Sequence, residues 1–567
     1  MTQDAPDHGP ELDACFGSIE RLCVERGIPV GRQLPAPSES LRFTVVFDSQ
    51  VWTLEVDCIG PRYSALPKVR LLAPLPLLAH VSYEGGVCIS DSQGLSIDID
   101  RRADVVAYSV GLAIDLLKNS LADAAGDRAE FYNEFEGYWH GMPAAYMARS
   151  TFEVDDRDRL LTGHIESRGK MRYWYFTEKD TPLHDDFRVK TAEKFRALYV
   201  VMPKPERPPA PGEELGMAYV ERIVAKFTPD QAALWDELLG PTMNSRKQVV
   251  LLVAVPRRDG GLSVNGMAFK VYKRKLEATE RVLPLNIRRH TGAYMRARGG
   301  ASGALAAKHV VVIGCGSVGS EVADALASSG VGHLTLVDPD RFSEDNVFRH
   351  VLGPSWAGLR KAYGLQSVLE KRYPGLKVEP YDAYAQVWLP TGDLATVDGI
   401  VLAIGMPTVE RMLLRQLRES GRDIPVVIAW LEPLDLGGHA VGVRLQGEGC
   451  LDCLYRDEEG TPDLVPRTAF MVPGQKVSLN LTGCASAFVP YGALQSRKTA
   501  LLATELMLDA LGGQSMPAYR FYSGSGTTAA AEGLQTTYWW QMAKSTSSAE
   551  GTAVVFGRPC AHCRSGP

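Results

Sequence analysis

The hydrophobic pattern of the second half of the chain alternates between two periods, and this alternation predicts a layered α/β fold. Mostly apolar, strand-like runs occupy 309–313 and 334–337, and between them apolar residues recur at helical spacing over 317–327. Two later apolar runs, at 399–404 and 425–429, continue the alternation. Strands separated by helices favour a mostly parallel sheet with helices on both faces.

The first 148 residues show another order of elements. The pattern predicts a helix, then three strands of an antiparallel meander, then two helices, at residues 12–26, 41–47, 51–56, 68–72, 105–121 and 128–138. Neighbouring strands followed by helices are typical of a compact α+β domain.

The middle of the chain mixes both patterns and carries no chemistry that we can identify. Strand-like runs at 172–176, 197–202 and 249–255 alternate with helical stretches at 216–226 and 229–239. The Pro-rich segment at 203–212 predicts an exposed connection. We therefore expect three domains, at residues 1–148, 149–280 and 281–567, with a linker or packing role for the second.

Composition and charge narrow the class of protein. The chain has 567 residues, of which 45% are hydrophobic and 23% charged, as in soluble globular proteins. A formal net charge of -6 argues against a nucleic-acid partner. No apolar run is expected to span a membrane, and the acidic, polar start is unlike a signal peptide. We expect a cytoplasmic protein, in which cysteines are metal ligands or nucleophiles rather than disulfides.

A glycine loop between the first strand and helix of the α/β region predicts a nucleotide site. Gly314, Gly316 and Gly319 permit a tight turn, a close backbone approach to phosphate, and close helix–strand packing. The phosphate would lie at the helix N-terminus, and Asp338, which ends the next strand, could accept hydrogen bonds from ribose hydroxyls. The loop alone would also suit a dehydrogenase.

Polar residues soon after Asp338 have two interpretations. Arg349 and Lys361 are either ordinary surface charges or cations that neutralise the phosphates of a nucleotide. Asn346 could orient the phosphates of the same nucleotide.

Four cysteines form two CxxC pairs, Cys450 with Cys453 and Cys560 with Cys563. Two such pairs are the ligand set of a closed, tetrahedral zinc site, which would join the chain end to the domain body. A redox role would need a thioredoxin-like context, which the sequence lacks.

Two further cysteines are candidate nucleophiles. Cys484 stands in NLTGCASAFVPYG, between the CxxC pairs, and is either an inert buried thiol or an acyl acceptor. Cys88 stands in EGGVCIS, eight residues after His80, and has the same two interpretations. Cys15, Cys23 and Cys58 fall in helix or strand patterns and are expected in the core.

Residues 281–567 resemble the ubiquitin-activating, ThiF/MoeB-type adenylating enzymes, through VVVIGCGSVGSEVA, LVDPDRFSEDNVFRH, GLRKA, the CxxC pairs and the cysteine before a late helix. The resemblance implies a Rossmann-like adenylation domain, a C2 homodimer, and cofactors ATP, Mg²⁺ and Zn²⁺. It places ATP on the residues Gly314, Gly316, Gly319, Asp338, Asp340 and Asn346. It implies that Arg349 and Lys361 act on the phosphates of ATP and that Cys484 is the acyl-accepting thiol.

One position departs from that family. An aspartate that helps to bind magnesium usually follows the strand at 399–404, and this chain has Gly405 there. Asp340 or Glu432 would have to contribute instead.

Residues 40–148 resemble a ubiquitin-conjugating domain, through the meander, a histidine eight residues before Cys88, and two final helices. The family's His-Pro-Asn triplet is missing, so His80, Ser82 or a backbone N–H would stabilise the oxyanion. The two domains in one chain resemble the fused enzymes of bacterial CBASS antiphage operons. In those, the C-terminus of a cGAS-like nucleotidyltransferase (CD-NTase) is adenylated, carried as a thioester, and joined to a target.

The resemblance implies the same thioester relay here, from Cys484 to Cys88 and then to an amine. A sulfur-carrier activating enzyme with an N-terminal docking module, and a non-catalytic nucleotide-binding scaffold, remain alternatives. A dehydrogenase is disfavoured, because no hydride-acceptor site accompanies the glycine loop.

Overall fold

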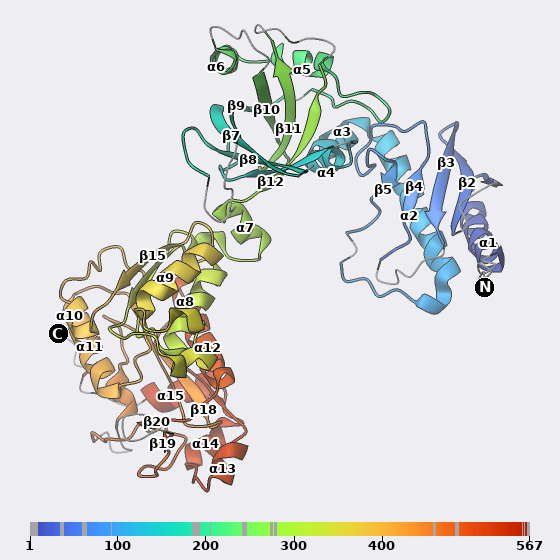
Figure 1. Ribbon diagram of the computed structural model, residues 1–567. Coiled ribbons are helices and arrows are strands. Elements are labelled where there is room, and N and C mark those ends of the chain that lie inside the picture. The colour runs from blue at the N-terminus through green and yellow to red at the C-terminus, as the bar shows by residue number, and fades with distance from the viewer. Residues whose placement is uncertain are drawn as a thin grey trace. The chain divides into compact units, whose positions relative to one another are not determined.

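The computed structural model describes residues 9–33, 39–58, 65–91, 93–143, 145–169, 171–183, 193–204, 206–240, 247–272, 276, 280–456, 461–481, 487–557, 560 and 562–563. Contacts divide the chain into two compact units, Met1–His290 and Thr291–Pro567. Figure 1 colours them from blue to green and from green to red. The three domains expected from the sequence stay a prediction.

The first unit begins with a five-stranded antiparallel sheet in the order β1-β2-β3-β4-β5. Its strands are β1 (Val30–Gln33), β2 (Ser40–Phe47), β3 (Gln50–Asp57), β4 (Val69–Leu71) and β5 (Gly86–Val87). Asp48 and Ser49, both at positive φ, form the two-residue turn between β2 and β3, which suits the twist of a hairpin. Alternate side chains of β2 are buried against α1 (Gly9–Glu25) and α2 (Arg102–Ala122).

By length and composition alone, helix α2 is long and apolar enough to cross a membrane, contrary to our expectation that no segment would be. It is the one such helix among the described residues, and 44% of its most apolar 18-residue stretch is buried. Val106, Val110, Ile114 and Leu117 pack into the core of the N-terminal sheet. The core helix of a soluble domain has the same length and composition.

The segment with no recognisable chemistry forms a closed seven-stranded barrel in the order β10-β11-β12-β6-β8-β7-β9. Its strands are β6 (Tyr146–Ser150), β7 (Arg159–Arg168), β8 (Met171–Glu178), β9 (Glu193–Val201), β10 (Lys247–Pro256), β11 (Leu262–Val271) and β12 (Leu283–Arg289). Closure depends on β6, which pairs in parallel with both β12 and β8. Apolar side chains such as Trp174, Phe176 and Leu252 fill the interior.

Four helices contribute to a second core on the outside of the barrel: α3 (Ala124–Asn133), α4 (Phe135–His140), α5 (Met217–Val224) and α6 (Pro229–Leu239). The single helix predicted over 128–138 is therefore two helices, which meet at Glu134. Phe135 and Trp139 of α4 are buried in this core with barrel residues such as Met267.

The second unit is built on a seven-stranded sheet in the order β15-β14-β13-β16-β17-β18-β21. The strands are β13 (His309–Ile313), β14 (His333–Val337), β15 (Lys377–Tyr381), β16 (Gly399–Leu402), β17 (Pro425–Leu431), β18 (Gly437–Arg444) and β21 (Ala518–Ser523). The strands β13 to β17 are parallel, and β18 and β21 extend the sheet antiparallel. A ribbon of β19 (Leu479–Asn480) and β20 (Ala487–Phe488) stands apart from this sheet.

Helices cover both faces of this sheet, as Figure 1 shows. Because successive strand residues point to opposite faces, Val310 and Val312 pack into one core while Val311 and Ile313 pack into the other. The first core includes residues of α8 (Ser317–Ser329), α9 (Lys361–Arg372) and α12 (Ala493–Leu511). The second includes residues of α10 (Ala385–Trp388), α11 (Pro407–Glu419) and α15 (Ser548–Phe556).

The unit also contains α7 (Gly292–Arg298), α13 (Thr527–Ala531) and α14 (Tyr538–Ala543). The parallel strands place the ends of β13, β14, β16 and β17 at one edge of the sheet. In open α/β sheets, ligands bind outside this edge.

Candidate functional site

The glycine loop lies where the sequence predicts it, between β13 and α8. Gly314 has φ +89°, and a Cβ on Gly319 would lie 1.7 Å from the carbonyl oxygen of Gly314. Gly316 precedes the first residue of α8 and has no atom within 4 Å of a would-be Cβ. The loop therefore leaves open space at the helix N-terminus, where a phosphate would be favoured.

Asp338 holds the loop rather than simply facing it. Its Oδ2 accepts the N–H of Cys315 at 2.6 Å, and its Oδ1 accepts the N–H of Asp340 at 2.8 Å. Burial raises the pKa of the Asp338 carboxyl. The positive charge of Lys361 and the two N–H groups act in the opposite direction and lower this pKa. Each carboxylate oxygen has a further lone pair that a hydroxyl could use.

His350, which the sequence analysis passed over, clamps the same loop from its other side. Its Nε2 lies 2.8 Å from the carbonyl oxygen of Cys315, and its Nδ1 accepts the N–H of Leu352 at 3.0 Å. Nε2 is therefore the nitrogen that carries the proton. Burial lowers the pKa of His350 to about 4, so the ring is neutral near pH 7. The motif LVDPDRFSEDNVFRH ends with this residue, but only the contact to the Cys315 carbonyl identifies its role.

The other predicted phosphate residues lie between β14 and the start of α9. Lys361 Nζ binds Asp340 Oδ2 at 2.8 Å; its side chain is 9% exposed, whereas that of Asp340 is 64% exposed. Asn346 Nδ2 donates to Ser343 Oγ at 2.7 Å.

Arg349 links this segment to the chain that follows Cys484. Its guanidinium carbon lies 4.7 Å from the ring centre of Tyr491 and 6.0 Å from that of Phe488. The Tyr491 hydroxyl in turn shares a 2.8 Å hydrogen bond with Ser317 Oγ, in the first turn of α8. Arg349 Nε is buried and has no hydrogen-bond partner in the described part of the chain. These contacts bring the 488–491 segment to the glycine loop.

Cys484 itself lies outside the described residues, as do its neighbours from 482 to 486. The strands on either side, β19 and β20, pair antiparallel through Leu479 with Phe488 and Asn480 with Ala487.

Two further carboxylates follow the strands at this edge. Glu432 accepts the N–H of Phe470 at 3.1 Å and lies 3.2 Å from His439, whose other ring nitrogen meets the Tyr519 hydroxyl at 2.7 Å. Glu432 thus belongs to a buried network. Glu410, a residue that sequence reasoning missed, accepts backbone N–H groups at the Gly405 turn.

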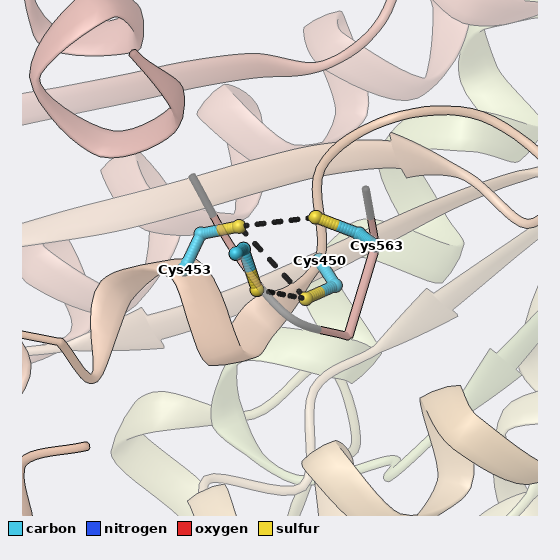
Figure 2. Close-up of side chains that lie close together, drawn as sticks. Cys450, Cys453 and Cys563 are labelled. Carbon is cyan, nitrogen blue, oxygen red and sulfur yellow. Dashed lines mark hydrogen bonds between the residues drawn. The ribbon is translucent and has the colours of Figure 1, made fainter. Parts of the chain in front are cut away.

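The four cysteines of the CxxC pairs meet in space, as predicted. Figure 2 shows the side chains of Cys450, Cys453 and Cys563 turned toward one another. Their sulfurs all lie within 4.8 Å of one another, with Cys450 3.8 Å from Cys453 and 3.7 Å from Cys560, and Cys453 3.5 Å from Cys563. A tetrahedral zinc with Zn–S bonds of about 2.3 Å requires sulfurs about 3.8 Å apart. The donor set therefore fits a structural zinc ion.

Cys88 is exposed at the end of a short hairpin in the first unit. Val81 pairs with Val87, and the N–H of Cys88 donates to the His80 carbonyl at 2.7 Å. Gly85 has φ +85°, and a Cβ there would lie 2.1 Å from the Leu71 carbonyl oxygen. Val87 is buried, whereas Cys88 is exposed, with its thiol 4.0 Å from the Ser90 carbonyl oxygen.

The oxyanion candidates near Cys88 are partly committed to other bonds. Ser82 Oγ accepts the Gly86 N–H at 2.9 Å, and the Cys88 N–H is bonded to His80. His80 has φ +59°, and its Nε2 lies 3.8 Å from Glu130. Of the remaining cysteines, Cys15, Cys23 and Cys58 are buried in the core, which confirms that prediction.

Parts of the chain are similar to known proteins. Residues 294–533 match the ThiF family. The chain is 23% identical to the ATP-dependent ubiquitin transferase-like protein Cap2 of Pseudomonas aeruginosa over 493 residues, which is 82% of this chain and 86% of that protein. It is 30% identical to Cap2 of Vibrio cholerae over 219 residues, 37% of this chain and 36% of that protein. A solved structure of MccB from Escherichia coli with ATP aligns with 41% of this chain and 64% of its own, at 16% identity and a TM-score of 0.30.

Proposed function

We propose that this chain joins the C-terminus of one protein to an amine of another. The chain is an ATP-dependent enzyme of the ubiquitin-like activating and conjugating type. It has a ThiF domain and is related to Cap2 over most of its length. The ThiF domain implies ATP and magnesium.

In the first proposed step, a carboxylate oxygen of the substrate tail attacks the α-phosphorus of ATP. The α–β phosphoanhydride breaks, pyrophosphate leaves, and an acyl-adenylate remains. Arg349 and Lys361 are suited to neutralise the charge on the phosphates, because both lie near the glycine loop and Arg349 Nε has no partner among the described residues. Asn346 is assigned to orient the same group.

Magnesium would meet Asp340 more readily than Glu432. The Asp340 side chain is 64% exposed, whereas Glu432 is buried against His439 and the Phe470 backbone. Magnesium keeps several waters and is usually bound through one or two carboxylates together with substrate phosphates.

In the second step, the thiolate of Cys484 attacks the acyl carbon and AMP leaves, which gives a thioester. Exchange with Cys88 moves the acyl group, and attack by an amine then forms the amide and frees the thiol. The observation that carries this proposal is the contact of Tyr491 with both Arg349 and Ser317, because it joins the segment after Cys484 to the expected phosphate position. The exposed thiol of Cys88 suits a later acceptor.

We assign residues 1–148 to conjugation, 149–280 to a linking domain formed mainly by the barrel, and 281–567 to adenylation. The tail of a cGAS-like nucleotidyltransferase is the proposed substrate. A homodimer through the adenylation domain would cover exposed apolar side chains such as Phe348, which is 94% exposed.

Zinc on Cys450, Cys453, Cys560 and Cys563 is proposed as a structural staple. It would fix the segment of Cys560 and Cys563 to the segment after β18. Metal analysis of the purified protein should find one zinc per chain, and Cys453→Ser should reduce it.

The central test is ATP–pyrophosphate exchange with a candidate tail peptide, followed by mass spectrometry of the protein under non-reducing conditions. Exchange should survive Cys484→Ala and Cys88→Ala, because neither thiol takes part in adenylation. Cys484→Ala should abolish both thiol-sensitive adducts, and Cys88→Ala should leave only the one on Cys484. Glu84→Gln, in the same hairpin as Cys88, is the matched control and should conjugate normally.

Conjugation that is unchanged in both cysteine variants would refute the relay. Transfer of sulfur in place of amide formation, with Cys88 dispensable, would support the sulfur-carrier alternative. Absence of exchange with every tail tested would support a scaffold.

A further inference from the structure

The turn after β16 is closed by a side chain of its own helix. Gly405 has φ +71°, and the N–H groups of Ile404 and Gly405 both donate to Oε1 of Glu410, at 3.1 and 3.0 Å. Glu410 lies in the first turn of α11 and is 2% exposed. Two successive N–H groups that converge on one oxygen form an anion-binding turn, and here the anion site is filled by the chain itself.

This turn forms one wall of the glycine loop. A Cβ on Gly314 would lie 2.7 Å from the Ala403 carbonyl oxygen and 2.9 Å from the Ile404 nitrogen. The nitrogen that packs on Gly314 therefore carries one of the two N–H groups bound by Glu410. A displacement of this peptide by a few tenths of an ångström would move or crowd the glycine loop.

Helix α11 is also held through Arg411, the residue after Glu410, and through Arg415, which bind the segment of the first CxxC pair. Arg411 Nε and Arg415 Nη2 bind Asp452 Oδ1 at 2.7 and 3.0 Å, and Asp452 stands between Cys450 and Cys453. The Asp452 side chain is 6% exposed, whereas those of Arg411 and Arg415 are 29% and 52% exposed, so only the carboxylate is shielded from water. The cysteine cluster thus fixes α11 in place, and Glu410 fixes the turn.

We propose that Glu410 is a positioning residue of the nucleotide site: through the 404–405 turn it holds Gly314 in its binding shape, and α11 ties that turn to the Cys450–Cys453 segment. The inference rests on the proposed adenylation function. Burial raises the pKa of Glu410 to about 7, so the neutral carboxyl is well populated and a glutamine reproduces its accepting oxygen.

The test compares three substitutions in the full-length protein. Glu410→Gln keeps an acceptor at the same reach and should remain within about threefold of wild type in ATP–pyrophosphate exchange. Glu410→Ala leaves two N–H groups without their acceptor and should raise KM for ATP about tenfold, with a smaller change in kcat. Glu410→Asp keeps a carboxyl group but is one methylene shorter, and should lie between them.

A second readout does not depend on activity. Hydrogen exchange of the peptide that contains residues 313–319 should accelerate in Glu410→Ala and Glu410→Asp but not in Glu410→Gln. Asp423→Ala is the control. Asp423 precedes β17, at the opposite edge of the sheet, where it binds Arg444, and its loss should change neither readout.

The possible results separate the two proposals. A wild-type protein without exchange activity would refute adenylation, while the hydrogen-exchange comparison would still decide the role of Glu410. Unchanged loop protection in Glu410→Asp and Glu410→Ala would overturn the inference, and so would a loss in Glu410→Gln equal to that in Glu410→Ala. If Glu410→Ala fails to fold, Glu410→Asp alone gives the decision.

Discussion

The loops that follow β13 and β16 pack against each other at one edge of the sheet, yet different constraints hold them. The glycine loop is held by residues from elsewhere in the unit, with the Cys315 N–H on Asp338 and its carbonyl on His350. The Gly405 turn is held locally, by Glu410 five residues later. Glycine at 319 is required because no space exists for a side chain, whereas glycine at 405 suits a left-handed backbone with open space around it. Steric exclusion and dihedral preference therefore act on neighbouring loops of one site.

The largest expected effect is Gly319→Ala. The new Cβ would lie 1.7 Å from the Gly314 carbonyl oxygen, a backbone atom that cannot rotate away. We expect the free energy of local opening around β13 to fall by about 4 kcal/mol, measured by hydrogen exchange of the β13 amides. Gly316→Ala is the matched control and should leave that value within about 0.5 kcal/mol, because its Cβ meets no atom within 4 Å and its φ of -77° suits alanine. Equal losses in the two variants would show that crowding is not the constraint.

Asp338→Ala comes next and tests the long-range clamp. It removes the acceptor of the Cys315 and Asp340 N–H groups in a site where Asp338 is 5% exposed. Leaving buried donors unpaired should cost about 3 kcal/mol of opening free energy in the same hydrogen-exchange measurement. Glu379→Gln, on the neighbouring β15, is a carboxylate control outside the loop and should have a smaller effect. A wild-type value in Asp338→Ala would mean that water replaces the carboxylate.

The sequence predicts the first of these loops far better than the second. The β13 strand and the starts of α8 and the glycine loop appear where the pattern places them, because strand, glycine spacing and terminal acid are all local signals. His350 and Glu410 give no such signal. Their roles consist of hydrogen bonds to backbone atoms of other residues, and the residue types alone do not tell which buried N–H or carbonyl needs a partner. Gly405 was noticed only as a departure from a family pattern.

The barrel was missed for a related reason. Its strands follow ordinary strand patterns, but closure depends on β6 pairing with β12, where Tyr146 meets Leu285 across a long stretch of sequence. Such pairing leaves no local signature, and two of the barrel's strands, β6 and β12, lie at the ends of the segment. The cysteine cluster is the opposite case: its ligand spacing predicted a contact between residues about 110 positions apart, because metal chemistry dictates the partners.

His350 provides a pH-dependent test of the glycine loop. Burial lowers its pKa to about 4 from an ordinary value near 6.5, so the unfolded chain binds the proton more tightly. The stability that it contributes is complete above about pH 6.5 and is lost as the pH falls toward 4, which amounts to about 2 kcal/mol at pH 5. His350→Gln removes this titration. Urea unfolding gives the free energy of unfolding of the wild type and of His350→Gln. The difference between these two values should change by about 2 kcal/mol between pH 7 and pH 5. A difference independent of pH would mean that the folded ring accepts the proton.

The smallest effect is expected for Gly405→Ala, which separates dihedral strain from crowding. Its φ of +71° is unfavourable for an L-residue, but no atom lies within 4 Å of the added Cβ. The cost should be about 1 kcal/mol in the hydrogen-exchange measurement used for Gly319→Ala, since only the backbone preference is opposed. Gly405→Asn should recover part of that loss, because asparagine tolerates left-handed backbone better than alanine does. The bonds from Ile404 and Gly405 to Glu410 use backbone N–H groups, so both variants can retain them. If asparagine is no better than alanine, or if either loss approaches that of Gly319→Ala, then the two loops obey the same steric constraint and the contrast between them is wrong.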